Sequence, residues 1–164
     1  FRSLELLEPL LPSLKMPDAL ALEGKNVSLA HMALEQKFFF KVYVWSLYLE
    51  EKPQANADAV SVNCVKRLQF RFLRHVTREQ LVDAFRDGLA SNAAMRGGPM
   101  KQEMDRLLGS LKDVPAGGEL IITYVPGGGL RVSGDASHGL SVAGKPFADA
   151  LFVSWLKQHP IFDT

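Results

Sequence analysis

The sequence predicts an α+β domain with a mainly antiparallel sheet and helices packed on one side of it. Strand-like patterns fill the first half of the chain, two helical patterns follow, and then more strands and one last helix. Segregated runs of this kind are typical of α+β domains. The 164 residues suit one domain and can bury a core without a metal or disulfide. We expect a lead-in at residues 1–18 and a single domain at 19–164.

Composition narrows the possible partners. The 19 basic and 18 acidic residues leave a formal charge of +1, which argues against nucleic acid as a partner. The single cysteine, Cys64, excludes an internal disulfide and is expected to be a small core residue. No apolar run reaches the roughly 20 residues of a transmembrane helix. The histidines show no metal-ligand spacing, so we expect no metal and no cofactor.

Proline and glycine positions, together with the alternation of apolar and polar residues, predict the secondary structure of the first part of the chain. Prolines among the leucines of residues 1–18 prevent one long helix there. Alternating apolar residues on both sides of Gly24 predict a hairpin. Residues 37–49, KFFFKVYVWSLYL, are rich in aromatic and β-branched side chains and apolar on both faces. They predict a long central strand covered on both sides, followed by a polar loop at 50–58.

In the later part of the chain, apolar residues recur at every second position in the expected strands and at helical spacing in the expected helices. Residues 65–76 predict a half-buried strand whose Arg67, Gln69 and Arg71 form a solvated face. Thr77 and Gln80 fit a capping box that opens a helix. The remaining expected elements are a helix from Pro99, a hairpin at 118–134, a short strand at 139–144 and a helix from Pro146.

Lys41 and Tyr43 stand out inside the most apolar stretch. They are two residues apart on a strand, so we expect them to share a face. Burying an ammonium group among apolar side chains costs free energy unless a negative or polar group pairs with it. Lys41 either extends to water or pairs with a carboxylate such as Glu35. The other interpretation is a pocket with apolar walls and a few converging polar groups.

Three segments together resemble chalcone isomerase-like proteins: KFFFKVYVWSLYLE, VTREQLVDAFRDGL and GKPFADALFVSWLKQHP. Their order and separation carry the resemblance over roughly residues 19 to 160. It implies an open-faced β-sandwich, in which a large antiparallel sheet has a layer of helices on one side. The family contains isomerases that close a flavanone ring. It also contains non-catalytic members, among them fatty-acid-binding proteins and bacterial relatives.

The resemblance also implies where catalytic groups would stand. The catalytic branch uses an arginine, a threonine, a tyrosine and an asparagine. Their positions fall at His31 (or Glu35 in a shorter register), Tyr43, Leu81 and Gly88, respectively. The polar catalytic groups are therefore missing or changed, and a site without oriented donors loses about two orders of magnitude or more in rate. We predict no catalytic residue and do not expect chalcone isomerisation.

The preferred hypothesis is a non-catalytic domain that binds a fatty acid or similar apolar carboxylate in a cleft between sheet and helices. Tyr43 would donate to the head group, as in a "KVY" of fatty-acid-binding relatives, and Lys41 would add charge. His31 would replace the arginine when protonated. Leu81 and Phe85 would line the apolar part.

Two alternatives remain. One is an isomerase (intramolecular lyase) acting on a chalcone-like or other enone, with Tyr43 as acid. The other is a partner-binding domain with a filled cleft. Bacterial relatives often carry export signals, so the resemblance predicts a periplasmic or exported location, with the cytoplasm as the alternative.

Overall fold

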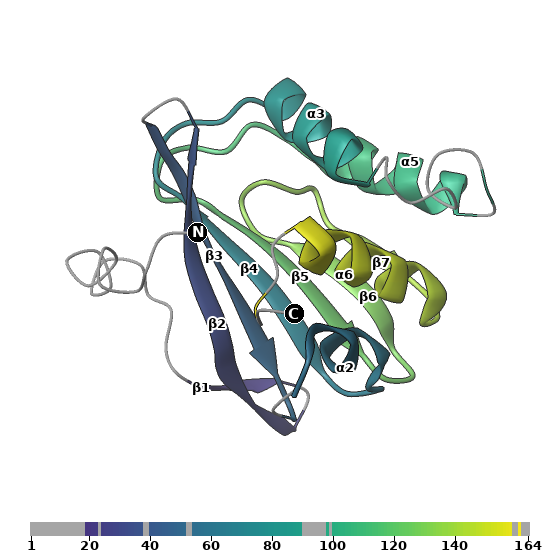
Figure 1. Ribbon diagram of the computed structural model, residues 1–164. Helices are drawn as coiled ribbons and strands as arrows, with labels where there is room; N and C mark the ends of the chain where they lie inside the picture. The colour runs from purple at the N-terminus through teal and green to yellow at the C-terminus, as the bar shows by residue number, and fades with distance from the viewer. Residues whose placement is uncertain are drawn as a thin grey trace.

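The computed structural model describes residues 19–22, 24–37, 40–51, 54–89, 98, 100–158 and 161. Within them, seven strands form one antiparallel sheet in which each strand pairs with its neighbours in sequence, from β1 to β7 (Figure 1). The strands are β1 Ala19–Leu22, β2 Lys25–Lys37, β3 Phe40–Leu49, β4 Lys66–Phe72, β5 Glu119–Val125, β6 Gly129–Ser133 and β7 Leu140–Val142. The predicted mainly antiparallel α+β architecture is confirmed.

Four helices are described, and they lie over one face of this curled sheet (Figure 1). They are α2 Asn56–Ser61, α3 Arg78–Leu89, α5 Lys101–Ser110 and α6 Pro146–Gln158. One hydrophobic cluster joins buried residues of all four to the inward side chains of β3–β7. None of the described helices has the length and apolar character needed to span a bilayer.

Local sequence signals account for most elements. Thr77 and Gln80 form the predicted capping box: the Gln80 amide N–H donates to Thr77 Oγ1 at 3.2 Å, and the Thr77 amide N–H donates to Gln80 Oε1 at 2.9 Å. In β3, residues of both faces are buried, including Trp45 and Tyr48 at 0% exposure, as a strand apolar on both sides predicts. Cys64 is buried, as expected.

The expected polar loop at 50–58 was wrong in part, because α2 begins within it. The short helix buries Ala59 and Val60 in the common core and contacts α6. Its six residues are too few for a helical hydrophobic pattern to be visible, so tertiary packing decides its conformation.

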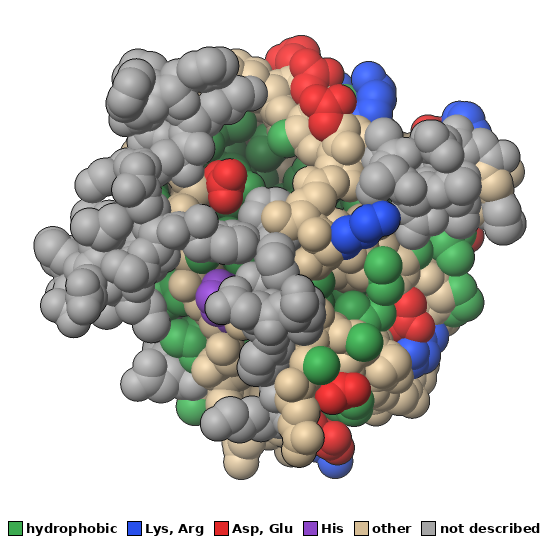
Figure 2. Space-filling view, in the orientation of Figure 1, with side chains coloured by type: hydrophobic (Ala, Val, Ile, Leu, Met, Phe, Trp, Pro, Cys, Tyr) green, Lys and Arg blue, Asp and Glu red, His purple; other side chains and the backbone are tan. Residues whose placement is uncertain are grey.

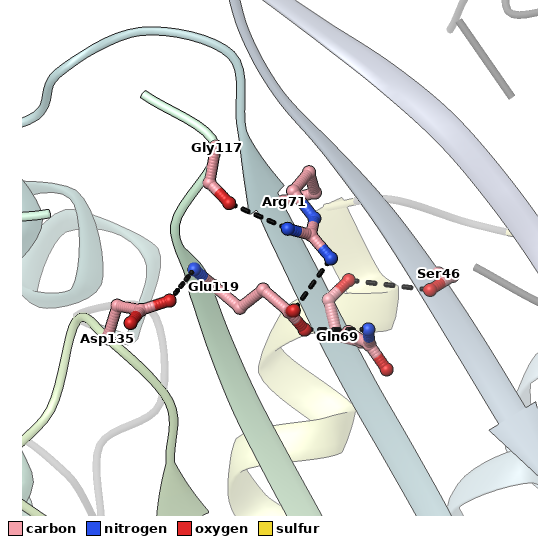
Figure 3. A network of polar contacts seen from close by, with 6 residues as sticks. All are labelled: Ser46, Gln69, Arg71, Gly117, Glu119 and Asp135. Carbon is pink, nitrogen blue, oxygen red and sulfur yellow. Dashed lines mark hydrogen bonds and ion pairs between the residues drawn. The ribbon is translucent and has the colours of Figure 1, made fainter. Parts of the chain in front are cut away.

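The outer face of β4 also corrects the sequence interpretation. Gln69 is buried rather than solvated, and it donates from Nε2 to Glu119 Oε2 at 2.9 Å (Figure 3). Arg71 contacts Glu119 Oε1 at 2.6 Å and donates to the carbonyl oxygen of Gly117 at 2.6 Å. Arg67 donates to Thr123 Oγ1 at 3.1 Å. Most of the partners of this polar face lie on β5, which is distant from β4 in sequence.

Candidate functional site

A pocket of about 240 Å³ lies between the inner face of the sheet and two helices. Its lining alternates along the strands as a sheet face requires, because every second side chain points the same way. On the face shown in Figure 2, hydrophobic side chains are recessed in a hollow beside an acidic side chain. The sheet contributes Glu35, Tyr43, Leu68, Phe70, Phe72, Leu120 and Ile122. The helices contribute Leu81, Ala84, Phe85, Gly88 and Leu89 of α3 and Leu151, Ser154, Trp155 and Gln158 of α6.

An aromatic group forms one wall of the pocket. The Tyr43 ring meets Phe70 edge-on, with centroids 5.5 Å apart, and lies 5.8 Å from Phe72 and 6.4 Å from Trp155. Trp155 in turn meets Phe70 edge-on at 5.0 Å. These are favourable separations for aromatic pairs. The packing holds the tyrosine ring in place and aligns its phenol relative to the pocket.

Glu35 and Tyr43 are direct partners across β2 and β3. Directly opposed residues of an antiparallel pair lie on the same face, about 5 Å apart at Cβ, and both line the pocket. Burial, and then the negative charge of Glu35, raise the pKa of Tyr43. The phenol is therefore a protonated hydrogen-bond donor at neutral pH.

The α6 side of the pocket carries the remaining polar groups. Ser154 Oγ donates to the carbonyl oxygen of Ala150 at 2.8 Å, which turns its proton toward its own helix. Gln158 Nε2 donates to the carbonyl oxygen of Gly88 at 2.7 Å and so links α6 to α3. Among the described lining residues, Glu35 alone carries a formal charge. The pocket is thus largely apolar, with an acceptor and a donor together at the β2–β3 end.

The structure brings together three of the five residues predicted for the site: Tyr43, Leu81 and Phe85. His31 is not among the described lining residues. It packs against Trp45, with ring centroids 5.1 Å apart, and burial lowers its pKa. A lowered pKa leaves the imidazole mostly neutral at pH 7, which does not favour it as a substitute for an arginine.

The fifth predicted residue is Lys41, whose side chain lies outside the described part of the chain. Its backbone pairs with Gln36, whereas Tyr43 pairs with Glu35, so Val42 is an extra residue in β3. Such a β-bulge interrupts the two-residue alternation. The inference that Lys41 and Tyr43 share a face assumed a regular strand, and the backbone does not keep that regularity.

Sequence reasoning considered Glu35 only as a partner for Lys41 and as one position for an arginine. The structure places it in the pocket opposite Tyr43. Knowing which residue of β2 pairs with Tyr43 would have identified Glu35. The bulge shifts the pairing of the two strands by one residue, so that register could not be predicted from the sequence. Leu81, Gly88 and Tyr43, the three positions aligned with catalytic groups on the helix and strand, meet in the same pocket.

The pocket can hold a small apolar body and orient one polar group. Its volume lies between that of a benzene-sized cavity, about 150 Å³, and the roughly 300–1,000 Å³ of drug-sized sites. No His, Cys, Asp and Glu cluster among the described residues is suited to hold a metal. Neither Leu81 nor Gly88, two of the lining residues, supplies a side-chain hydrogen-bond donor.

Comparison with known proteins supports this architecture. A family model described as "Chalcone isomerase-like" matches residues 11–164. A search of curated proteins finds no match. Among solved structures, the Arabidopsis thaliana fatty-acid binding protein AtFAP1 is similar, with a TM-score of 0.60 and 11% sequence identity. The similarity covers 88% of this chain and 83% of that one. At this identity it establishes a shared fold.

Proposed function

Because the chain belongs to the chalcone isomerase-like family, we propose that it is a non-catalytic protein that binds a fatty acid or a similar single-chain amphiphile. The ligand lies in the pocket between the sheet and α3 and α6. Its hydrocarbon body contacts the apolar lining, and its polar head reaches the phenol of Tyr43. The carrying observation is this apolar pocket of about 240 Å³ with a protonated phenol in its wall.

The chemistry of the lining supports binding over catalysis. Leucine and glycine occupy two of the positions aligned with catalytic polar groups, Leu81 and Gly88. Burial holds the phenol of Tyr43 in its neutral form, which suits hydrogen-bond donation to a ligand head group. The similar solved structure is that of a fatty-acid binding protein, which supports the choice of ligand class.

The direct test begins with the ligand that the protein carries. The protein is purified without detergent, and bound lipids are extracted and identified by mass spectrometry. Purified, delipidated protein is then titrated with octanoic, dodecanoic and hexadecanoic acid. Because the pocket is small, we expect the shorter chains to bind best. Absence of both co-purified lipid and saturable binding of any of the three acids would overturn the proposal.

A matched pair of variants locates the binding site. A Cβ on Gly88 would meet Gln158 side-chain atoms at an ordinary distance of 3.7 Å, so alanine fits there. Gly88→Leu adds a branched side chain at the pocket wall and is expected to weaken binding at least tenfold, whereas Gly88→Ala retains most of it. Equal affinities for the two variants would place the ligand elsewhere. A parallel screen of chalcones for turnover tests the isomerase alternative.

A further inference from the structure

We infer that the ligand of this pocket carries a single aromatic ring on a short chain, as an aryl-substituted alkanoic acid does. The ring lies between Phe85 of α3 and the paired rings of Tyr43 and Trp155. This inference rests on the proposed function and specifies the apolar body of the ligand in that same site. It arises from the distribution of those aromatic side chains that the core does not fully bury.

Partly exposed aromatic surface gathers in this pocket. Most of the phenylalanine, tyrosine and tryptophan side chains that the structure describes are fully buried. The others, Tyr43, Phe85 and Trp155, are half-buried, and all of them line the pocket. They belong to β3, α3 and α6, which are remote from one another in sequence. Among the described residues, the aromatic surface that the core leaves uncovered therefore borders one space.

These rings reach the pocket from both of its walls. The centroids of Tyr43 and Trp155 are 6.4 Å apart, and both rings pack edge-on with Phe70 of β4, at 5.5 Å and 5.0 Å. Phe85 comes from α3, one of the two helices that face the sheet across the pocket. Aromatic rings attract one another in edge-to-face or offset arrangements at centroid separations of about 4.5–7 Å. A ligand ring between Phe85 and the Tyr43–Trp155 pair can make such contacts on both sides.

The volume of the pocket limits the body of the ligand. A cavity of about 150 Å³ holds a benzene molecule, so the pocket volume of about 240 Å³ leaves room for a short chain beside one ring. Two rings would need roughly 300 Å³ on the same scale, which argues against a two-ring ligand. A linear chain with the same number of carbons has more rotatable bonds to order on binding, and this ordering lowers its affinity.

Three acids with the same number of carbons test the inference: 4-phenylbutanoic, 4-cyclohexylbutanoic and decanoic acid. They share the carboxyl group, so differences in affinity report on the body alone. Calorimetric titration of the delipidated protein at neutral pH should show the phenyl acid binding roughly two- to tenfold more tightly than the cyclohexyl acid, which is the gain from one aromatic pair. A pocket that only buries apolar surface would instead favour the larger cyclohexyl ring. Decanoic acid should bind measurably, but more weakly than the phenyl acid.

The variant Phe85→Leu supplies the decisive comparison. It removes the only aromatic side chain that α3 contributes to the described lining, and leucine keeps the position apolar and helical. The ratio of the affinities for the phenyl and cyclohexyl acids should fall at least twofold. Phe147→Leu, at a buried position of α6 outside the described lining, is the control and should leave this ratio unchanged. If Phe85 only supported the fold, its loss would change both affinities together and leave their ratio as it is.

The outcomes separate this inference from the proposed function. If decanoic or 4-cyclohexylbutanoic acid binds the wild-type protein as tightly as 4-phenylbutanoic acid, or if Phe85→Leu leaves the affinity ratio unchanged, the aromatic preference is wrong while binding of an amphiphile stands. If none of the three acids binds, the proposed function itself is wrong. Folding of each variant is verified by circular dichroism and thermal unfolding before the affinities are compared.

Discussion

Gln158 in the last turn of α6 donates a hydrogen bond of 2.7 Å to the carbonyl oxygen of Gly88 in α3. Both residues line the pocket, so this bond joins the two helices that cover it. Elsewhere the helices meet through apolar side chains of the common core. The polar contact between Gln158 and Gly88 is therefore positioned to control how readily the cover separates from the sheet.

Removing this bond should affect ligand release more than stability. Gln158→Ala loses one exposed hydrogen bond, which contributes at most about 1 kcal/mol to the free energy of unfolding. We expect the dissociation rate of a bound amphiphile, measured by stopped-flow displacement, to rise severalfold. Lys157→Ala, an exposed neighbour on the same helix, is the control. Equal dissociation rates for the two variants would show that the Gln158–Gly88 bond does not restrain the cover.

The phenol of Tyr43 should matter for affinity and little for folding. Tyr43→Phe keeps the ring contacts with Phe70, Phe72 and Trp155 and removes only the hydroxyl. A neutral hydrogen bond contributes about 0.5–1.5 kcal/mol, so calorimetric affinity for dodecanol should fall roughly two- to tenfold. Thermal unfolding should change little.

The matched control for that variant is Tyr124→Phe. The Tyr124 hydroxyl donates to Asn63 Oδ1 at 2.7 Å, and Tyr124 is not among the described lining residues. This variant should lower stability by about 0.5–1.5 kcal/mol without changing affinity. If Tyr124→Phe lost as much affinity as Tyr43→Phe, the prediction that the Tyr43 hydroxyl binds the ligand would be wrong.

Lys66 gives the stability a pH dependence. Its side chain is buried, its Nζ donates to the carbonyl oxygen of Val60 at 2.5 Å, and it lies near the rings of Tyr124 and Phe152. Burial lowers its pKa below the ordinary 10.5. Between the folded and the unfolded pKa, the unfolded chain binds more protons, so stability rises with pH and levels off above 10.5.

Urea unfolding at a series of alkaline pH values tests this assignment. The rise in the free energy of unfolding below pH 10.5 should be present in the wild-type protein and absent from the variant Lys66→Met. The methionine side chain has a similar shape to lysine and does not titrate. Because many other groups also titrate, the difference between the two curves is the measured quantity. A difference that is constant across this range would contradict the assignment to Lys66.

The capping box at the start of α3 should stabilise the helix that lines the pocket. Thr77→Ala removes the acceptor for the Gln80 amide, and the loss of such a cap costs about 0.5–2 kcal/mol. Chemical denaturation measures the change in the free energy of unfolding. The control is Ser133→Ala, a substitution at an exposed position of β6. A change no larger than that of the control would mean that the cap contributes nothing to stability.

Much of the fold could be predicted from the sequence because its determinants are local. The aromatic and β-branched run of residues 37–49, the Thr77–Gln80 box and the turn at Gly127–Gly129 act over a few residues each. Tyr43, Leu81 and Phe85 could be predicted as neighbours only with a family resemblance, because α3 is remote in sequence from β3. Their placement in one pocket agrees with that resemblance, whereas ligand binding by them stays a prediction.

Alternation, helical spacing and turn residues are signals within single segments, and from them the type and order of every described element except α2 could be predicted. Tertiary structure alone decided the character of the site. The bulge at Val42 sets which residues face each other across β2 and β3, and so brings the Glu35 carboxylate beside Tyr43 in the pocket. The same holds for buried Lys66 and the paired outer face of β4, because their partners come from segments that only folding brings together.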